Sequence, residues 1–142
     1  MPKQIDVAIL THEGGAHIAA YLTALKASPN VRKVFLADPS QRFLGQAKTR
    51  LGDKFAGTDK DAKRLLKQHK PTLALVSMEA ALAPPVIDLA LDANCHVFAE
   101  KPACVRAEDF AQLEKKATAN KRYLMLALAN RLNPEIQAAR SI

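Results

Sequence analysis

The sequence contains no tryptophan, only 2 cysteines and no apolar run long enough to cross a bilayer. Cys95 and Cys104 form neither a disulfide framework nor a metal-ligand pattern, and the four histidines are scattered. We therefore expect two reduced, structural cysteines and no metal site. The N-terminus also lacks the long apolar segment and cleavage site of a signal peptide. These absences predict a cytoplasmic protein with no membrane partner.

Aromatic residues are scarce, at 5% of the sequence, whereas 21 lysines and arginines face 14 acids and give a net charge of +7. This excess raises nucleic acid or an anionic cofactor as a partner. The basic residues are concentrated in 60–70 and 115–122, mostly on predicted helices, with few aromatics between them to stack on bases. A solvated helix face is the favoured interpretation, and we expect no nucleic-acid partner.

The chain does contain a regular alternation of short apolar runs and helical patterns. Its 142 residues, 49% of them apolar, predict one globular domain with a substantial core. Strands are predicted at 5–10, 34–37, 72–76, 97–99 and 123–127. Helices are predicted from 18 up to Pro29, and at 41–51, 59–69, 86–93, 107–120 and 134–142, while 54–61 contains only a short apolar piece. The alternation predicts a doubly wound parallel α/β sheet, a Rossmann fold in three layers.

The first predicted strand ends in a turn that contains two glycines, THEGGAH, and a helix follows it. In dinucleotide-binding units a glycine turn brings the backbone close to a pyrophosphate, which the helix N-terminus attracts. The candidate cofactor-binding residues of this turn are Thr11, His12, Gly14, Gly15, Ala16 and His17.

The second predicted strand ends at an acid, Asp38, about twenty residues past the glycines. An acid in this place accepts hydrogen bonds from the adenosine ribose and repels a 2′-phosphate, which favours NAD. The alternative is a structural role for Asp38 in an Asx turn or a helix cap. Arg42 follows one helical turn later and could receive a 2′-phosphate, so NADP stays open as the cofactor.

The stretch His96 to Pro102 reads HVFAEKP, a short apolar strand that ends in a charged pair and a proline. Glu100 and Lys101 should lie at the carboxyl end of a buried parallel strand, the sheet edge where ligands bind in open α/β sheets. A lysine there can donate a proton or hold a polar ligand group. The alternative is an ordinary surface salt bridge.

HVFAEKP, the amphipathic helix after it, the next strand and the segment NRLNP together resemble the Gfo/Idh/MocA oxidoreductases, relatives of glucose–fructose oxidoreductase and inositol dehydrogenase. The resemblance covers nearly the whole chain. It implies a nicotinamide-dependent enzyme with an N-terminal Rossmann domain and a C-terminal α/β domain. Residues 1–130 would form the first domain, and 131–142 would begin the connection to the second, which is absent from this chain.

The resemblance also implies the remaining site residues. The family's EKP lysine lies beside nicotinamide and substrate, and Lys101 is the matching residue, with Glu100 orienting it. Further cofactor contacts would come from Ser77, Met78, Asn130 and Arg131. The family's GxGxxG falls here on Thr11, Glu13 and Ala16, and Met78, Glu79 and Ala83 stand where the family has Thr, Pro and a later His.

Two functions are therefore compared. The first is the NAD(P)-binding domain of an oxidoreductase that transfers a hydride between nicotinamide and a hydroxyl-bearing carbon, with a small polyol or sugar as substrate of the longer protein. Alone, this domain should not turn over. The second is a non-catalytic Rossmann-like binding or regulatory module. Self-association into a homo-oligomer is left open, with apolar residues near Leu128, Leu132 and Ile136 as its surface.

Overall fold

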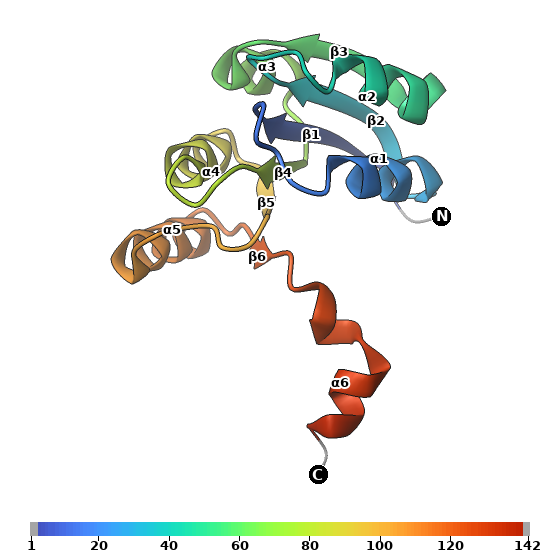
Figure 1. Ribbon diagram of the computed structural model, residues 1–142. Coiled ribbons are helices and arrows are strands. Elements are labelled where there is room, and N and C mark those ends of the chain that lie inside the picture. Colours follow the sequence, from blue (N-terminus) through green and yellow to red (C-terminus); the bar gives the residue numbers. More distant parts are fainter. Residues whose placement is uncertain (1–2, 141–142) are drawn as a thin grey trace.

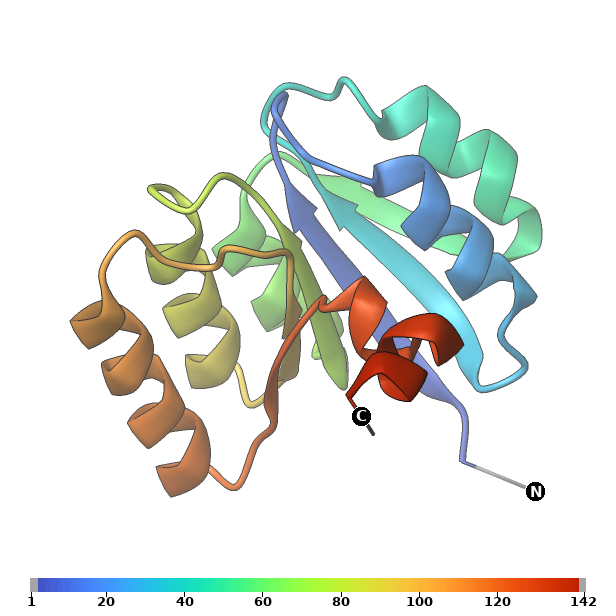
Figure 2. The ribbon, with the colours of Figure 1, turned by 60° about the horizontal axis from the view of Figure 1, so that its bottom comes forward.

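The computed structural model describes residues 3–140 as a six-stranded parallel sheet with the order β3-β2-β1-β4-β5-β6. The strands are β1 (Ile5–Thr11), β2 (Val31–Ala37), β3 (Phe55–Asp59), β4 (Leu73–Ser77), β5 (His96–Ala99) and β6 (Leu124–Leu126). The helices are α1 (Ile18–Ala27), α2 (Leu44–Leu51), α3 (Ala62–His69), α4 (Ala83–Asp92), α5 (Ala107–Ala119) and α6 (Pro134–Ala139), with short 3₁₀ turns η1 (Gly52–Lys54) and η2 (Ala129–Leu132). Figures 1 and 2 show helices on both sides of the sheet, which confirms the predicted Rossmann fold.

Two hydrophobic cores lie on opposite faces of this sheet because side chains alternate along each strand. On one face, Val7 and Ile9 of β1 pack with buried residues of α1 and α2. On the other face, Ala8 and Leu10 pack with buried residues of α3, α4 and α5. Since β1 is buried on both faces, its sequence is a continuous apolar run, the pattern expected for a central parallel strand.

Strand β3 is the element that the sequence pattern did not resolve. Its five residues alternate between half-buried and exposed, and they pair with β2 at one edge of the sheet. An edge strand of this kind has few apolar residues, so its pairing with β2 and not its own hydrophobicity defines it.

Helix α2 begins three residues later than predicted. Gln41 has a φ of 58°, and the amide of Leu44 donates to the Gln41 carbonyl, so a tight turn occupies the stretch before the helix. The carboxylate of Asp38 accepts hydrogen bonds from the Ser40 and Phe43 amides and holds this turn. Local side-chain hydrogen bonds thus replace the first helical turn.

Cys95 is fully buried, and its thiol donates to the Pro71 carbonyl at 3.2 Å. Burial raises its pKa to about 11, against a smaller opposing effect of Arg122. The folded state therefore holds this proton at a pH where the unfolded chain, with a thiol pKa of about 8.5, loses it. The stability contributed by the neutral thiol is complete below about pH 8.5 and is lost as the pH rises towards 11.

We expect denaturant unfolding to show this loss between pH 8.5 and 10.5, on the order of 1–2 kcal/mol. The same titration of Cys95→Ala should have a flatter slope over this range, whatever its stability at neutral pH. Identical slopes in the two proteins would contradict the assignment.

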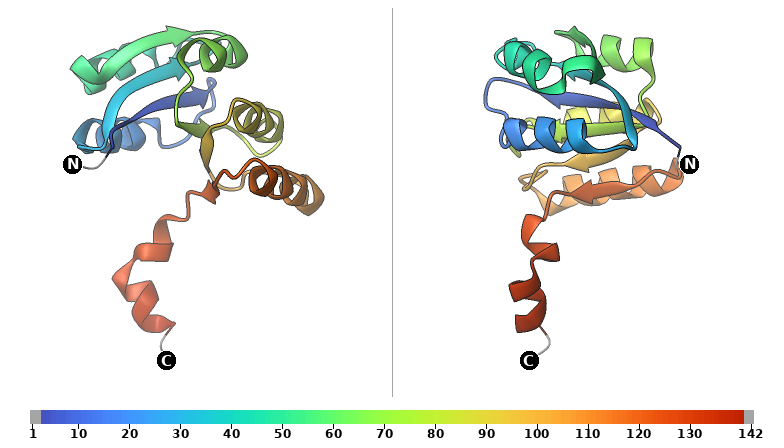
Figure 3. Two further views of the ribbon diagram at one scale, coloured as in Figure 1. Left: turned by 180° about the vertical axis from the view of Figure 1, so that it is seen from behind. Right: turned by 90° about the vertical axis from the view of Figure 1, so that its right-hand side faces the viewer.

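The segment after β6 leads away from the sheet in both views of Figure 3. Its side chains Leu128, Leu132 and Ile136 are exposed, at 49%, 78% and 44% of their surfaces. The boundary between a first domain and a connecting segment at residue 130 stays a prediction. Residues 141–142 of the last predicted helix lie outside the described part of the chain. No helix within residues 3–140 is long and apolar enough to cross a membrane.

Candidate functional site

The carboxyl ends of β1, β4 and β5 meet at a pocket of about 280 Å³. In the sheet, β2 and β3 lie on one side of β1, whereas β4, β5 and β6 lie on the other side. Such a reversal of strand order separates the loops and opens a crevice for a ligand. The pocket is lined by residues of all three loops: Gly14, Ala16, Met78, Glu79, Ala80, Glu100, Lys101 and Pro102.

Two buried hydroxyls connect the end of β4 to the loop after β1 that contains Gly14 and Gly15, here called the glycine loop. Thr11 Oγ1 donates to the Ser77 carbonyl at 2.8 Å, and Ser77 Oγ donates to the Ala16 carbonyl at 2.7 Å. A side chain at Gly15 would collide with Thr11 Oγ1. Thr11 therefore replaces the first glycine of the family pattern with a structural hydrogen bond, and Gly15 leaves the space that this bond needs.

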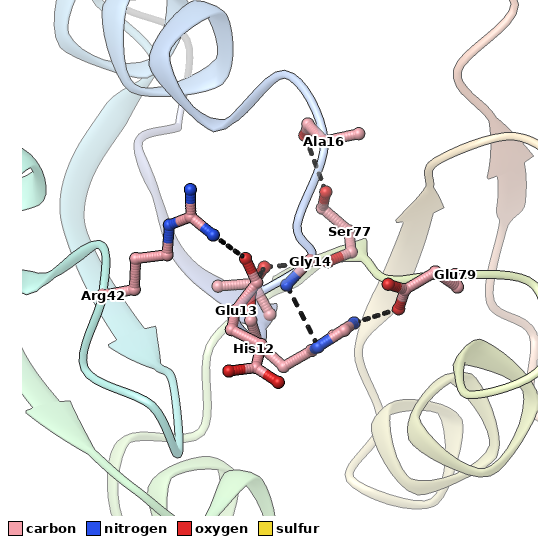
Figure 4. Close-up of polar contacts among 8 residues, drawn as sticks. His12, Glu13, Gly14, Ala16, Arg42, Ser77 and Glu79 are labelled. Carbon is pink, nitrogen blue, oxygen red and sulfur yellow. Dashed lines mark hydrogen bonds and ion pairs between the residues drawn. The ribbon is translucent and has the colours of Figure 1, made fainter.

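The other loop glycine lies against a carboxylate (Figure 4). The Gly14 amide donates to His12 Nδ1 at 3.2 Å. Nε2 faces the Glu79 carboxylate, in the geometry of an ion pair and not of a directed hydrogen bond. A Cβ built on Gly14 would overlap Glu79. Glu79 thus occupies the space that a glycine at this position leaves open.

The side chains of Asp38 and Arg42 both form hydrogen bonds to loop backbone in this structure. Asp38 is buried, and its carboxylate accepts from the Ser40 amide and hydroxyl, at 3.0 and 2.6 Å, and from the Phe43 amide at 3.0 Å. Arg42 Nη1 donates to the Glu13 carbonyl at 2.8 Å, which ties the loop after β2 to the glycine loop (Figure 4). Asp38 therefore has the structural role in its own turn that the sequence left open as an alternative. Its carboxylate can still accept a hydrogen bond from a further donor, because it has two oxygens.

Glu100 is the buried acid of the pocket, with 5% of its surface exposed. Its Oε2 is 3.0 Å from His17 Nδ1 and accepts from the Tyr21 hydroxyl, while Oε1 accepts from the Lys101 amide at 3.1 Å. Burial opposes ionisation of this carboxyl, but these hydrogen bonds outweigh burial and hold its pKa below the ordinary value. Burial and the bond to Glu100 raise the pKa of Tyr21.

Lys101 has an exposed side chain on the rim of the pocket. Within residues 3–140 its ammonium makes no ion pair, because Glu100 is held by α1 instead. The surface salt bridge between Glu100 and Lys101 that the sequence allowed is therefore absent from the described structure. Lys101 is left available to a ligand.

Tyr21 is a site residue that the sequence analysis missed, because it fits the apolar face of α1 as a core residue. One signal was available: Tyr21 follows His17 by four residues, which places both on one helix face. We expect Tyr21→Phe to remove a hydrogen bond to a buried carboxylate and to lower the free energy of unfolding at pH 7 by about 1.5–3 kcal/mol.

The pKa of Glu100 provides the specific readout for this variant. Folding lowers the pKa of the Glu100 carboxyl. The stability that its ionised form contributes is therefore present above the pKa of the unfolded chain and is lost as the pH falls through the pKa of the folded protein. Tyr21→Phe should move that loss to a higher pH. Thr23→Val, on the exposed side of the same helix, is the control and should leave it in place.

The four other residues that we expected to contact the cofactor divide into two groups. Met78 lines the pocket, and Ser77 holds the loop. Asn130 and Arg131 lie exposed in η2 and do not line it. No three His, Cys, Asp or Glu side chains of residues 3–140 are grouped as metal ligands.

Several solved structures resemble this chain. GenD2 from gentamicin A biosynthesis, in complex with NAD, is 22% identical with a TM-score of 0.86, over 99% of this chain and 39% of GenD2. Scyllo-inositol dehydrogenase from Lactobacillus casei, with NAD(H) and scyllo-inositol, is 17% identical with a TM-score of 0.79, over 98% and 40%. KijD10, a 3-ketoreductase from Actinomadura kijaniata with NADP and TDP-benzene, is 26% identical with a TM-score of 0.78, over 98% and 42%.

This chain thus spans about two fifths of the length of these proteins. No curated protein sequence matches it. Residues 19–128 match the oxidoreductase family described as having an NAD-binding Rossmann fold, which is most of the chain. With the strand order and the pocket at its reversal, this match shows that the chain belongs to the Gfo/Idh/MocA oxidoreductase family and contains its NAD-binding Rossmann domain.

Proposed function

We propose that this chain is the cofactor-binding part of an oxidoreductase that transfers a hydride between nicotinamide and a hydroxyl-bearing carbon of a sugar or cyclitol. The observation that carries the proposal is the convergence of the glycine loop and the Glu100–Lys101 pair on one pocket at the sheet reversal. The solved relatives hold NAD, NAD(H) or NADP, and one holds scyllo-inositol.

The residues present fit a dinucleotide at two points. Helix α1 has no side-chain cap at its N-terminus, so its first-turn amides are available to a phosphate. The exposed Lys101 ammonium stands at the pocket rim, where it can donate a hydrogen bond or a proton to a substrate oxygen. When bound, the nicotinamide would give or take the hydride.

Glu100 has a positioning role in this proposal. Its carboxylate accepts from the Lys101 amide, from Tyr21 of α1 and from His17, the residue before α1, so it fixes the backbone from which the Lys101 side chain extends. Loss of this acid would leave the Lys101 side chain poorly placed.

Thermal unfolding with NAD and, in parallel, NADP tests the proposal. A bound ligand stabilises the folded state by mass action, by about 2.7 kcal/mol at one hundred times its Kd. We expect the midpoint to rise with NAD and Asp38→Asn to weaken this rise. Because Asp38 also holds its own loop, the variant is compared with itself in the absence of ligand.

No rise with either dinucleotide at millimolar concentration would favour the second function, a Rossmann-like module without catalysis. One observation favours that alternative: the Glu79 carboxylate lies where a phosphate would approach Gly14. The two functions differ in whether removal of this carboxylate restores dinucleotide binding.

A further inference from the structure

A second cavity lies at the amino ends of β4 and β5, at the opposite end of these strands from the cofactor pocket. It measures about 710 Å³, within the range of small-molecule sites, and is formed where α3 and α4 end and β4 and β5 begin. The cofactor pocket lies at the carboxyl ends of the same strands. The proposed hydride transfer uses none of the residues of this second cavity.

Three lysines at α3 and its C-terminal end line this cavity. Lys63 and Lys67 are four residues apart on one face of α3, and Lys70 follows as the C-cap of the helix, so three like charges lie along one cavity. None of them forms an ion pair within residues 3–140, whereas the neighbouring Arg64 is bonded to Asp59 through two nitrogens. The local structure therefore leaves the repulsion between these lysines uncompensated.

The helix dipole explains only part of this arrangement. Lys67 and Lys70 lie near the C-terminus of α3, where a cation is favoured. Lys63 lies in the first turn, where the dipole opposes a positive charge. The helix dipole therefore does not account for the position of Lys63.

The rest of the lining adds a fixed cation and an apolar wall. Arg122 is anchored through Nε to the Asn94 carbonyl at 2.7 Å, which holds its guanidinium at the cavity. The acid of the lining, Asp92, lies 2.7 Å from Lys116, a lysine that it shares with Asp88. Leu89 and Ala93, which are partly exposed, contribute apolar surface to the same cavity.

We propose that this cavity binds a small polyanion with an apolar or planar portion, of the nucleoside diphosphate type. The three lysines and Arg122 would receive the phosphates, because clustered cations bind polyanions strongly. Leu89 and Ala93 would cover the base. This site is separate from the cofactor pocket, which lies at the carboxyl ends of the same strands.

The test is a titration of the full chain with ADP, followed by calorimetry and by the NMR shifts of assigned backbone amides. We expect the Thr72 and Asn94 amides at the cavity to shift. The triple variant Lys63→Gln, Lys67→Gln, Lys70→Gln should weaken ADP binding at this site at least tenfold. A matched triple variant of exposed lysines elsewhere, Lys33→Gln, Lys48→Gln, Lys115→Gln, should retain it.

Several outcomes would overturn the proposal. Equal weakening in both triple variants would mean that only net charge matters. Shifts confined to Gly14 and Gly15 would mean that ADP binds the dinucleotide pocket alone. Inorganic tripolyphosphate binding as tightly as ADP would remove the role of the apolar wall. Lys63→Gln alone relieves repulsion and should not lower the thermal midpoint, so a loss of ADP binding in this single variant cannot come from unfolding.

Discussion

Glu79→Gln is expected to increase the affinity of the chain for a nicotinamide dinucleotide about tenfold. The Glu79 carboxylate lies against Gly14 and faces His12 Nε2, while His12 Nδ1 accepts from the Gly14 amide. A pyrophosphate at the glycine loop would meet the negative charge of this carboxylate. Two like charges 4 Å apart repel by about 4 kcal/mol at an effective dielectric of 20.

Solvent reduces this repulsion, because 56% of the Glu79 side chain is exposed. A residual of about 1.4 kcal/mol corresponds to the tenfold change. Glutamine keeps the size of the side chain and removes its charge, so the gain reports electrostatics and not added space. Calorimetric titration of NAD into both proteins measures it.

Glu13→Gln is the matched control. It removes one negative charge from the same loop, but the Glu13 side chain is exposed and Figure 4 shows its carboxylate pointing away from Gly14. We expect a change of less than about twofold in this variant. An equal gain in both variants would assign the effect to net charge, and no gain in Glu79→Gln would contradict a competition between Glu79 and the phosphate.

Leu36→Ala is expected to lower the free energy of unfolding by about 2–5 kcal/mol. Leu36 is fully buried in β2, where it is the ladder partner of Ile9 in β1 and part of the core under α1 and α2. Both strands lie inside the sheet, so the surrounding structure cannot collapse fully into the space that the leucine leaves. Such a loss is a large part of the total stability of a domain of this size.

Chemical denaturation at neutral pH measures this effect, with Leu132→Ala as the control for the same substitution. Leu132 is 78% exposed in η2, and its truncation should change stability by less than about 0.5 kcal/mol. A loss of several kcal/mol in Leu132→Ala would mean that this segment is packed against another surface in solution. A loss below about 1 kcal/mol in Leu36→Ala would contradict the packing described for the core.

The parts of the fold that the sequence predicted are those that carry their own local signal. Strand β1 is apolar throughout because it is buried on both faces, and HVFA of β5 is bounded by Asn94 and a proline. The glycine turn and the acid after β2 have fixed places in a dinucleotide-binding unit. The predicted loops at the carboxyl ends of β1, β4 and β5 do line one pocket.

The parts that the sequence did not predict depend on residues far apart in the chain. Tyr21 and Glu100 are 79 residues apart, and only the approach of α1 to the end of β5 joins them. Glu79 and His12 meet for the same reason, across β4 and β1. In each case a polar side chain has several possible partners, and sequence spacing alone does not select one of them.

The sequence alone therefore determined the α/β class and the order of most elements, because hydrophobic periodicity and turn chemistry act over a few residues. The family came from the resemblance of HVFAEKP and NRLNP to its motifs. The tertiary structure decided what the polar residues do. It assigned the Asp38 carboxylate to its own loop, left Lys101 without an ionic partner in the described residues, and brought Glu79 against Gly14. The physical reason is that hydrogen bonds and ion pairs are selected by which strand ends and loops meet in space, and this is fixed only when the whole sheet has assembled.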